Sequence, residues 1–178
     1  MTVAEQKKSL RRELIQRRRE LPTEEKRAWD ERIFKRLLPL LEQCSGVFTY
    51  VSTDIEVDTR RVIDWCFQQG LPVFTPVSGD SELTFFEVHC WDGLKSGRFG
   101  IDEPSDRTKD AYADEKSLCI VPALCCDRNG FRLGYGRGYY DRFLAGFPGK
   151  TAVLCYSEFV GEVPLAAHDR CADMVITD

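Results

Sequence analysis

A near-continuous apolar run at residues 117–125 restricts the fold of this chain more than any other feature. A strand with one solvent-exposed face alternates apolar and polar residues, whereas an unbroken apolar strand is typical of a parallel sheet covered on both faces. The chain before this run fits such a sheet. Residues 46–52 and 71–77 have the pattern of strands, and between them lies an amphipathic segment that Asp58 caps and Gly70 stops. The pattern predicts strand, helix and strand in a parallel, helix-covered sheet.

Three further segments, at residues 83–90, 151–156 and 174–177, also have the composition of strands. The chain has 178 residues, which is the length of one ordinary domain. We therefore expect an α/β fold in which residues 1–178 form a single three-layer domain. Its central sheet is expected to be mostly parallel and covered by helices on both faces.

The N-terminal region differs from the rest of the chain in charge. Residues 1–36 contain twelve Lys and Arg against seven Asp and Glu, a net charge of +5 in a chain whose total is −4. Leu10 and Leu14 lie on one face of a predicted first helix, which is expected to pack on the domain. Thr23 is a good N-cap for a second helix, and Pro39 should end or kink that helix. The region therefore predicts a helical arm with a cationic face.

Composition excludes several classes of function. The net charge of −4 argues against a general nucleic-acid binder, because phosphate backbones are held by an excess of basic residues. No apolar run approaches the roughly 20 residues that span a bilayer, so we expect a cytoplasmic protein without a membrane partner. The eight cysteines are scattered without a Cys-x-x-Cys pair. We expect them to be small buried hydrophobes in a reducing compartment.

Residues 127–142 concentrate the chemistry, in the order Asp-Arg-Asn-Gly-Phe-Arg-Leu-Gly-Tyr-Gly-Arg-Gly-Tyr-Tyr-Asp-Arg. This segment directly follows the buried strand, which is where ligands bind in α/β sheets. Its closely spaced glycines allow successive N–H groups to converge on an anion, and its arginines suit phosphate oxygens. Asp141 among these arginines is expected to bind a hard cation such as Mg²⁺, which bridges carboxylates to substrate phosphates.

A purely structural interpretation of the same segment is the alternative. In that case the glycines form a tight turn, and Asp141 pairs with Arg137 or caps the helix. Spacing excludes two familiar phosphate sites, because there is neither a Gly-x-x-x-x-Gly-Lys-[Ser/Thr] loop nor a Gly-x-Gly-x-x-Gly motif. The glycines alone leave a turn and a phosphate site equally open, and the arginines after a buried strand favour phosphate.

Five blocks of the chain match one known family in that family's order. The longest runs from Val121-Pro122-Ala123-Leu124 through Asp127 to Arg132-Leu133-Gly134-Tyr135-Gly136-Arg137-Gly138-Tyr139-Tyr140-Asp141. The others are Lys7 to Arg11, Glu56 to Thr59, Gly100 to Pro104, and Pro164 to Asp178. Together they resemble the 5-formyltetrahydrofolate cyclo-ligases, also called methenyltetrahydrofolate synthetases.

The resemblance implies an ATP- and Mg²⁺-dependent enzyme on a three-layer α/β fold. Its substrate is 5-formyltetrahydrofolate, with or without a polyglutamate tail, and its products are 5,10-methenyltetrahydrofolate, ADP and phosphate. In this family the formyl oxygen attacks the γ-phosphate of ATP, and N10 then attacks the activated carbon before phosphate leaves. The protein has to position the reactants and stabilise charge, as phosphoryl transfer generally demands.

The resemblance also implies which residues form the site. The ATP-binding residues would be Lys7, Lys8, Ser9, Leu10, Arg11, Arg132, Leu133, Gly134, Tyr135, Gly136, Arg137, Gly138, Tyr139 and Tyr140. The substrate-binding residues would be Val51, Glu56, Tyr135, Gly136, Arg137, Gly138 and Tyr139. A carboxylate at Glu56 suits the pterin, whose ring nitrogen and exocyclic amine are adjacent donors. A solvated loop glutamate is the alternative for a lone Glu.

Catalytic and metal-binding roles follow from the same resemblance. Arg132, Arg137 and Tyr139 are expected to act in catalysis. Asp141 resembles the Mg²⁺ ligand, and Asp169 is expected as a second metal ligand, with a cap of a helix or loop as the alternative.

Two positions depart from the family pattern, and two rival functions stay open. Arg137 stands where the family often has Lys or Gly, and Cys126 where it commonly has an aromatic residue.

One rival function is that of a non-enzymatic nucleotide or phosphate sensor, and the other is that of a phosphotransferase for another small molecule. A nucleophilic role for Cys126 has little support, since His89 and His168 supply no evident base.

Overall fold

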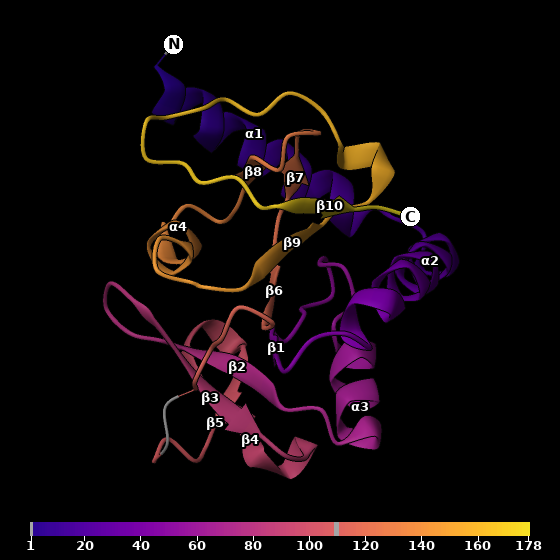
Figure 1. Ribbon diagram of the computed structural model, residues 1–178. Coiled ribbons are helices and arrows are strands. Elements are labelled where there is room, and N and C mark those ends of the chain that lie inside the picture. The colour runs from indigo at the N-terminus through magenta and orange to yellow at the C-terminus, as the bar shows by residue number, and fades with distance from the viewer. Residues whose placement is uncertain (1, 109–110) are drawn as a thin grey trace.

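The computed structural model describes residues 2–108 and 111–178, and within them six strands form one sheet in the order β10-β9-β6-β1-β2-β3 (Figure 1). These strands are β1 (Val47–Phe48), β2 (Val73–Ser78), β3 (Leu83–Val88), β6 (Leu118–Val121), β9 (Lys150–Leu154) and β10 (Met174–Ile176). Neighbouring strands from β10 to β2 run parallel, and only β3 pairs antiparallel with β2. The prediction of a mostly parallel central sheet is confirmed.

Four α-helices and several short elements complete the described part of the chain. The helices are α1 (Val3–Arg19), α2 (Thr23–Leu41), α3 (Arg60–Gln69) and α4 (Tyr139–Leu144). Two small antiparallel sheets pair β4 (Leu94–Ser96) with β5 (Asp102–Pro104) and β7 (Cys125–Cys126) with β8 (Arg132–Leu133). The short 3-10 helices are η1 (Trp91–Gly93), η2 (Arg98–Gly100) and η3 (Ser157–Phe159).

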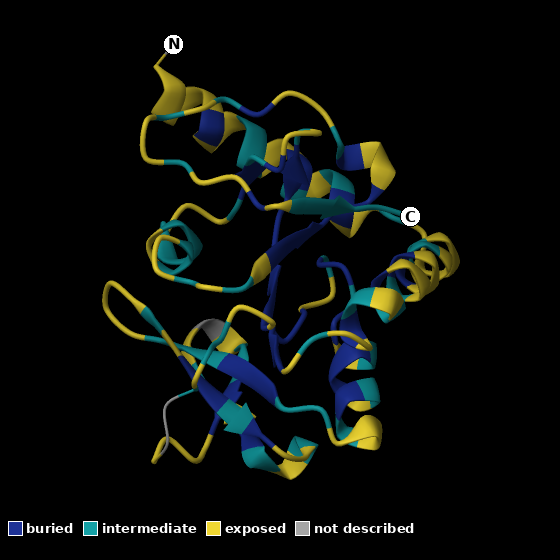
Figure 2. Ribbon diagram, viewed as in Figure 1, coloured by how far each residue is buried: buried dark blue, intermediate teal, exposed yellow. Residues whose placement is uncertain are grey.

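Helices cover both faces of the central sheet because successive residues of its strands point to opposite sides. Val47 packs in one core cluster with Ile33 of α2 and Ile63 of α3. The next residue, Phe48, packs on the other face, where its ring lies 6.2 Å from that of Phe143 in α4. Figure 1 accordingly places α3 and α4 on opposite sides of the sheet, and Figure 2 shows that β1, β6 and β9 between them are mostly buried. The three-layer prediction is confirmed.

The second helix ends later than the sequence pattern predicts. Pro39 lies inside α2, which continues to Leu41, so this proline does not end the helix, and the alternative of a kink stays a prediction. A proline in the last turn removes one N–H donor, and only a short stretch of helix follows it. At the other end Pro22 occupies the N-cap position and Thr23 is the first helical residue, without a side-chain capping bond.

The third helix begins at a different cap from the one predicted. Thr59, not Asp58, occupies the N-cap position of α3. Asp58 still contributes, because its Oδ1 accepts a hydrogen bond of 2.9 Å from the N–H of Arg60 at the start of the helix. Gly70 ends the helix with a φ of 65°, a left-handed conformation that glycine adopts without strain, as its position in the sequence predicts.

Most cysteines are buried, but two are not. Cys66, Cys119, Cys125, Cys126 and Cys155 are buried and Cys44 is partly buried. Cys90 and Cys171 are exposed, which corrects the expectation for these two; all eight are free thiols. Among the described residues, no helix combines the length and the apolar character needed to cross a bilayer.

Candidate active site

A cavity of about 1580 Å³ opens at the carboxyl ends of three parallel strands. Val51 follows β1, Ser78 ends β2, and Pro122 follows β6, and all three line it. The predicted strand at 46–52 is cut short at Phe48, and the residues after it leave the sheet to form this wall. The position is the one expected for ligands in an α/β sheet.

Most of the predicted site residues line this one cavity, although they come from distant parts of the chain. They are Lys7, Arg11, Val51, Glu56, Arg132, Leu133, Gly134, Tyr135, Gly136, Arg137, Gly138, Tyr139, Tyr140, Asp141 and Asp169.

Three predicted ATP-binding residues do not line the cavity. Lys7 and Arg11 are four positions apart and therefore project from the same face of α1. Lys8 and Ser9 lie on other faces of the helix and are exposed, while Leu10 packs against the core. The block at the start of the chain therefore contributes only two of its five side chains to the cavity.

Arg11 joins the first helix to the glycine loop, residues 134–138. Its Nε donates a hydrogen bond of 2.8 Å to the carbonyl oxygen of Gly134. Gly136 has a φ of 94°, and a β-carbon there would lie 2.9 Å from the guanidinium carbon of Arg11. The backbone conformation therefore favours glycine at this position, and any side chain there would displace the Arg11 guanidinium.

Lys7 forms a nearly buried ion pair with Asp169. The Nζ atom of Lys7 lies 2.7 Å from Oδ1 of Asp169, and the two side chains are 11% and 9% exposed. Burial by itself raises the pKa of Asp169, but the hydrogen bonds from Lys7 and from the N–H of Ala166, together with the Lys7 charge, outweigh it and lower the pKa below its usual value. Asp169 is therefore a carboxylate whose two oxygens are already engaged.

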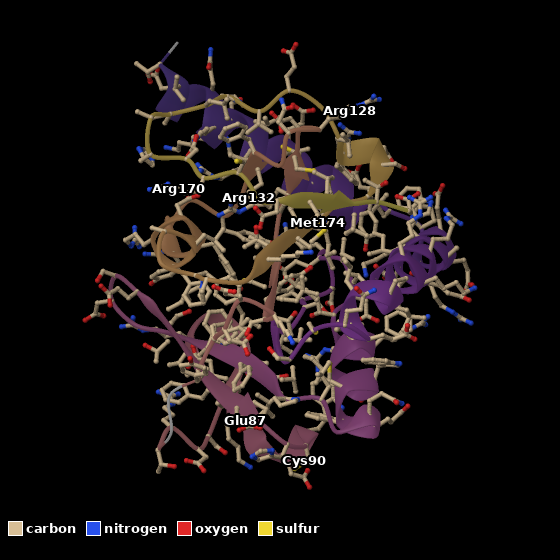
Figure 3. All side chains as sticks on the ribbon, in the orientation of Figure 1. Glu87, Cys90, Arg128, Arg132, Arg170 and Met174 are labelled. Atoms are coloured by element: carbon tan, nitrogen blue, oxygen red, sulfur yellow. The ribbon has the colours of Figure 1, made fainter. Side chains whose placement is uncertain are left out.

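Arg132 holds Asp141, the first of the two predicted metal ligands. Its Nη2 donates a bond of 3.0 Å to Oδ1 of Asp141, and its Nη1 donates a bond of 2.7 Å to the carbonyl oxygen of Arg170. The N–H of Arg170 donates to the same Asp141 oxygen at 3.2 Å. Figure 3 shows Arg132 and Arg170 close together beside α4. The structure therefore gives Asp141 an ion pair, with Arg132 as the partner where the structural interpretation of the sequence named Arg137.

The carboxylates fit a Mg²⁺ ion for which the protein would supply only some of the ligands. Within the described ranges, no three His, Cys, Asp or Glu residues gather in a group able to hold a metal ion. Mg²⁺ usually takes one or two carboxylates and completes its shell with water and substrate phosphates, so such a group is not required. Oδ2 of Asp141 accepts no hydrogen bond from the residues described, whereas both oxygens of Asp169 accept one. Asp141 therefore fits this ion better than Asp169.

A second wall of the cavity is formed around Glu56. This side chain is buried, and its Oε2 accepts hydrogen bonds from the N–H of Thr53 at 2.8 Å and from the Thr53 hydroxyl at 2.9 Å. Tyr135 of the glycine loop is 44% exposed as a residue, but burial of its phenol and the nearby Glu56 charge both raise the pKa of that phenol. Glu56 is thus a buried carboxylate at the cavity wall rather than a solvated loop residue.

Contacts around the start of α4 connect the glycine loop to the turn between β2 and β3. Gly138, with a φ of 68°, is the N-cap of α4. The Tyr139 hydroxyl donates to the carbonyl oxygen of Gly79 at 2.9 Å. Arg142 donates to the carbonyl oxygens of Ser81 at 2.7 Å and Arg137 at 2.8 Å. Two catalytic candidates, Arg137 and Tyr139, are therefore held at the cavity rim.

Four further residues line the cavity. Arg142, one of the arginines that the sequence pattern assigns to phosphate, and Arg170 add positive charge, and Ser78 and Glu103 contribute from β2 and β5. The sequence pattern gave no site role to Ser78, Glu103 and Arg170, although Glu103 and Arg170 lie inside blocks that resemble the family. The hypothesis of a nucleophilic Cys126 loses support, since its hydrogen bond with Cys155 and its burial both raise the pKa of its thiol, and Cys126 does not line the cavity.

The fold and the site define a parallel α/β protein with a cationic, glycine-walled ligand cleft at the carboxyl edge of its sheet. A family model described as the 5-formyltetrahydrofolate cyclo-ligase family matches residues 3–178. The chain belongs to this family of enzymes.

Individual relatives and solved structures agree with this assignment. The 5-formyltetrahydrofolate cyclo-ligase of Mycolicibacterium smegmatis is 30% identical, with 96% of this chain and 93% of the relative covered. The Escherichia coli K12 enzyme of the same name is also 30% identical, over 91% and 94% of the two chains. The NMR structure of Aquifex aeolicus 5,10-methenyltetrahydrofolate synthetase has a TM-score of 0.84 at 29% identity, covering 96% of this chain and 89% of that one. The Mycoplasma pneumoniae synthetase, at 22% identity and a TM-score of 0.75 over 96% and 97% of the chains, shares the fold.

Proposed function

We propose that this enzyme converts 5-formyltetrahydrofolate to 5,10-methenyltetrahydrofolate with ATP and Mg²⁺, releasing ADP and phosphate. One observation carries the proposal: a single cavity of about 1580 Å³ joins a cationic wall to a wall with a buried carboxylate. Pockets for one drug-sized ligand measure roughly 300–1,000 Å³, so this cavity has room for two reactants side by side. The family membership supports the same reaction.

The cationic wall suits the nucleotide. Lys7, Arg11 and Arg137 line it, and their charges match the polyphosphate of ATP. Asp141 would hold Mg²⁺ through its second oxygen, and the ion would neutralise charge on the transferring phosphate. For Asp169 to bind the same ion, Lys7 would have to leave it and turn toward a phosphate.

The opposite wall suits the folate. Glu56 presents an acceptor to the adjacent donors of the pterin, and Val51 and Tyr135 supply flat and apolar surface beside it. A buried carboxylate that accepts hydrogen bonds from a ligand discriminates strongly, because a ligand without those donors leaves it unsatisfied. This wall would therefore select the pterin and orient the formyl group.

The chain's own residues would act by positioning and by stabilising charge. Arg132 keeps Asp141 oriented, since it donates to that carboxylate and is itself anchored on Arg170. Arg137 lies beside the position proposed for the phosphates and would stabilise the charge that develops during transfer. Tyr139, fixed through its bond to Gly79, would close the rim and exclude water from the reacting atoms.

The test is the appearance of methenyltetrahydrofolate by absorbance when protein, ATP, Mg²⁺ and 5-formyltetrahydrofolate are mixed. Product should form in step with ADP and phosphate, and a chelator or the omission of ATP should stop it. ATP binding without any product would support a sensor. ATP consumption that ignores folate would support a phosphotransferase for another substrate.

A further inference from the structure

Four consecutive residues around Glu56 each have their backbone held by a different buried side chain. The bonds are Arg18 Nη1 to the Ile55 carbonyl at 2.9 Å, Tyr50 hydroxyl to the Val57 carbonyl at 3.0 Å, and Asp58 N–H to Asp30 Oδ1 at 3.0 Å. The Tyr156 hydroxyl shares its single proton between Asp30 Oδ1 at 2.7 Å and the Glu56 carbonyl at 3.2 Å. The anchors come from α1, α2 and the segments that follow β1 and β9. Such a frame leaves the Glu56 backbone little freedom.

Arg18 is the unusual member of this frame. It is 2% exposed, and the hydrogen bonds that its guanidinium makes go to backbone carbonyls. Its Nη2 is buried and has no hydrogen-bond partner within the described part of the chain. The rings of Tyr156 and Phe159, 5.2 and 4.8 Å away, stabilise the charge in part. Burying a guanidinium is costly, so a buried arginine is weak evidence of a purely stabilising role.

The same guanidinium connects both walls of the cavity. Its Nε donates to the carbonyl oxygen of Leu124 at 3.0 Å. The N–H of Leu124 in turn donates to the carbonyl oxygen of Leu133 at 2.8 Å, directly before the glycine loop. Arg18 therefore ties the Glu56 segment to the strand pair from which the glycine loop begins.

We infer that Arg18 is a positioning residue for the folate, acting through Glu56. The inference rests on the proposed assignment of Glu56 to the pterin. Arg18 lies behind the wall and does not line the cavity, so it does not touch the ligand. It fixes the Ile55 carbonyl, and thereby the backbone from which the neighbouring carboxylate extends. Tyr156 and Tyr50 share this function at the next two residues.

A double-mutant cycle tests the inference with equilibrium binding of 5-formyltetrahydrofolate to the full chain. We expect Glu56→Gln and Arg18→Met each to weaken folate binding by about tenfold, the scale of a lost hydrogen bond to a charged group. In the Glu56→Gln background, Arg18→Met should weaken folate binding by less than a further factor of about two, since the carboxylate that Arg18 positions is already absent. Arg18→Lys, which keeps a donor, should restore part of the affinity.

Matched controls separate positioning from a loss of fold. Arg17→Met removes the neighbouring arginine of the same helix, which pairs with Glu158 at the surface, and should leave folate affinity unchanged. ATP affinity in the Arg18 variant should change less than folate affinity. If Arg18→Met does not fold, Tyr156→Phe replaces it in the cycle, because Tyr156 lies outside the cavity lining and its hydroxyl contacts the Glu56 carbonyl and Asp30.

The outcomes are distinct. Equal losses from Arg18→Met in both backgrounds would overturn the inference and leave the proposed function standing. Unchanged folate affinity in Glu56→Gln would instead remove Glu56 from the folate site and the inference with it, and the absorbance assay would decide the activity separately.

Discussion

The ammonium of Lys7 donates to both oxygens of Asp169, a residue 162 positions further along the chain, and it lies 2.7 Å from one of them. The contact ties the first helix to the C-terminal segment that runs beside it in Figure 1. It also places a cation that the proposed function assigns to ATP against a carboxylate of the same cavity.

Lys7→Met should destabilise the protein and weaken ATP binding together. The substitution leaves the Asp169 carboxylate nearly buried without its cation, which costs about 1–3 kcal/mol of unfolding free energy. The Michaelis constant for ATP should rise while that for folate changes little. Urea unfolding and steady-state kinetics measure the two effects. Arg12→Met, an exposed change on the same helix, is the control, and an equal loss there would contradict the assignment.

The Lys7 and Asp169 pair should also leave a signature in the pH dependence of stability. The pKa of Asp169 is lowered in the folded protein, so the pair contributes stability above the unfolded pKa of about 3.9 and loses it as pH falls through the lower folded value. The difference in unfolding free energy between the wild type and Lys7→Met should therefore be largest near neutral pH and shrink below about pH 4. Denaturant titrations at several pH values would show this, and a difference that stays constant would count against it.

Gly136→Ala should damage the glycine loop through Arg11. The backbone there has a φ of 94°, and the new β-carbon would lie 2.9 Å from the Arg11 guanidinium carbon. A left-handed conformation costs a non-glycine residue roughly 1–2 kcal/mol, and displacement of Arg11 should raise the Michaelis constant for ATP. Gly161→Ala, where the β-carbon meets open space, is the matched control. Equal behaviour of the two variants in thermal unfolding and ATP saturation would refute the argument.

Asp141→Asn should separate the metal site from the ion pair. The amide keeps an acceptor for Arg132, but this guanidinium is only 4% exposed and loses its counter-charge, so the loss of unfolding free energy should be about 1–3 kcal/mol. If Asp141 holds Mg²⁺, turnover should fall on the order of hundreds-fold and need more Mg²⁺ for saturation. Turnover measured across a Mg²⁺ titration checks this, with the surface change Glu162→Gln as the control. Near-normal turnover at low Mg²⁺ would leave Asp141 as a structural partner of Arg132.

Local patterns in the sequence were sufficient to predict most of the sheet and the glycine loop that lines the cavity. The apolar run at residues 117–125 predicted a strand buried on both faces, and β6 (Leu118–Val121) lies in the middle of the sheet. Gly70 predicted a helix end that the structure confirms. These signals depend on residues only a few positions apart in the sequence, because hydrophobic periodicity and turn conformation are properties of short segments.

Helix ends, and which face of the first helix lines the cavity, were harder to predict from the sequence. Pro39 is expected to end or kink its helix, and the helix nevertheless continues to Leu41, since tertiary packing of Leu37 and Leu41 outweighs the local preference. The resemblance implied five consecutive ATP-binding residues from Lys7 to Arg11. A helix can direct only one side of such a block into a cavity, so the two end residues line it and the three between them do not.

The sequence by itself determined a parallel α/β fold with glycines and arginines after its buried strand, because periodicity, composition and turn residues are local and readable. Only the tertiary structure decided that Lys7 meets Asp169, that Arg132 holds Asp141, and that buried side chains from four segments fix the backbone beside Glu56. Each of these contacts joins residues whose approach depends on how helices and strands pack. No pattern within a single segment encodes that packing.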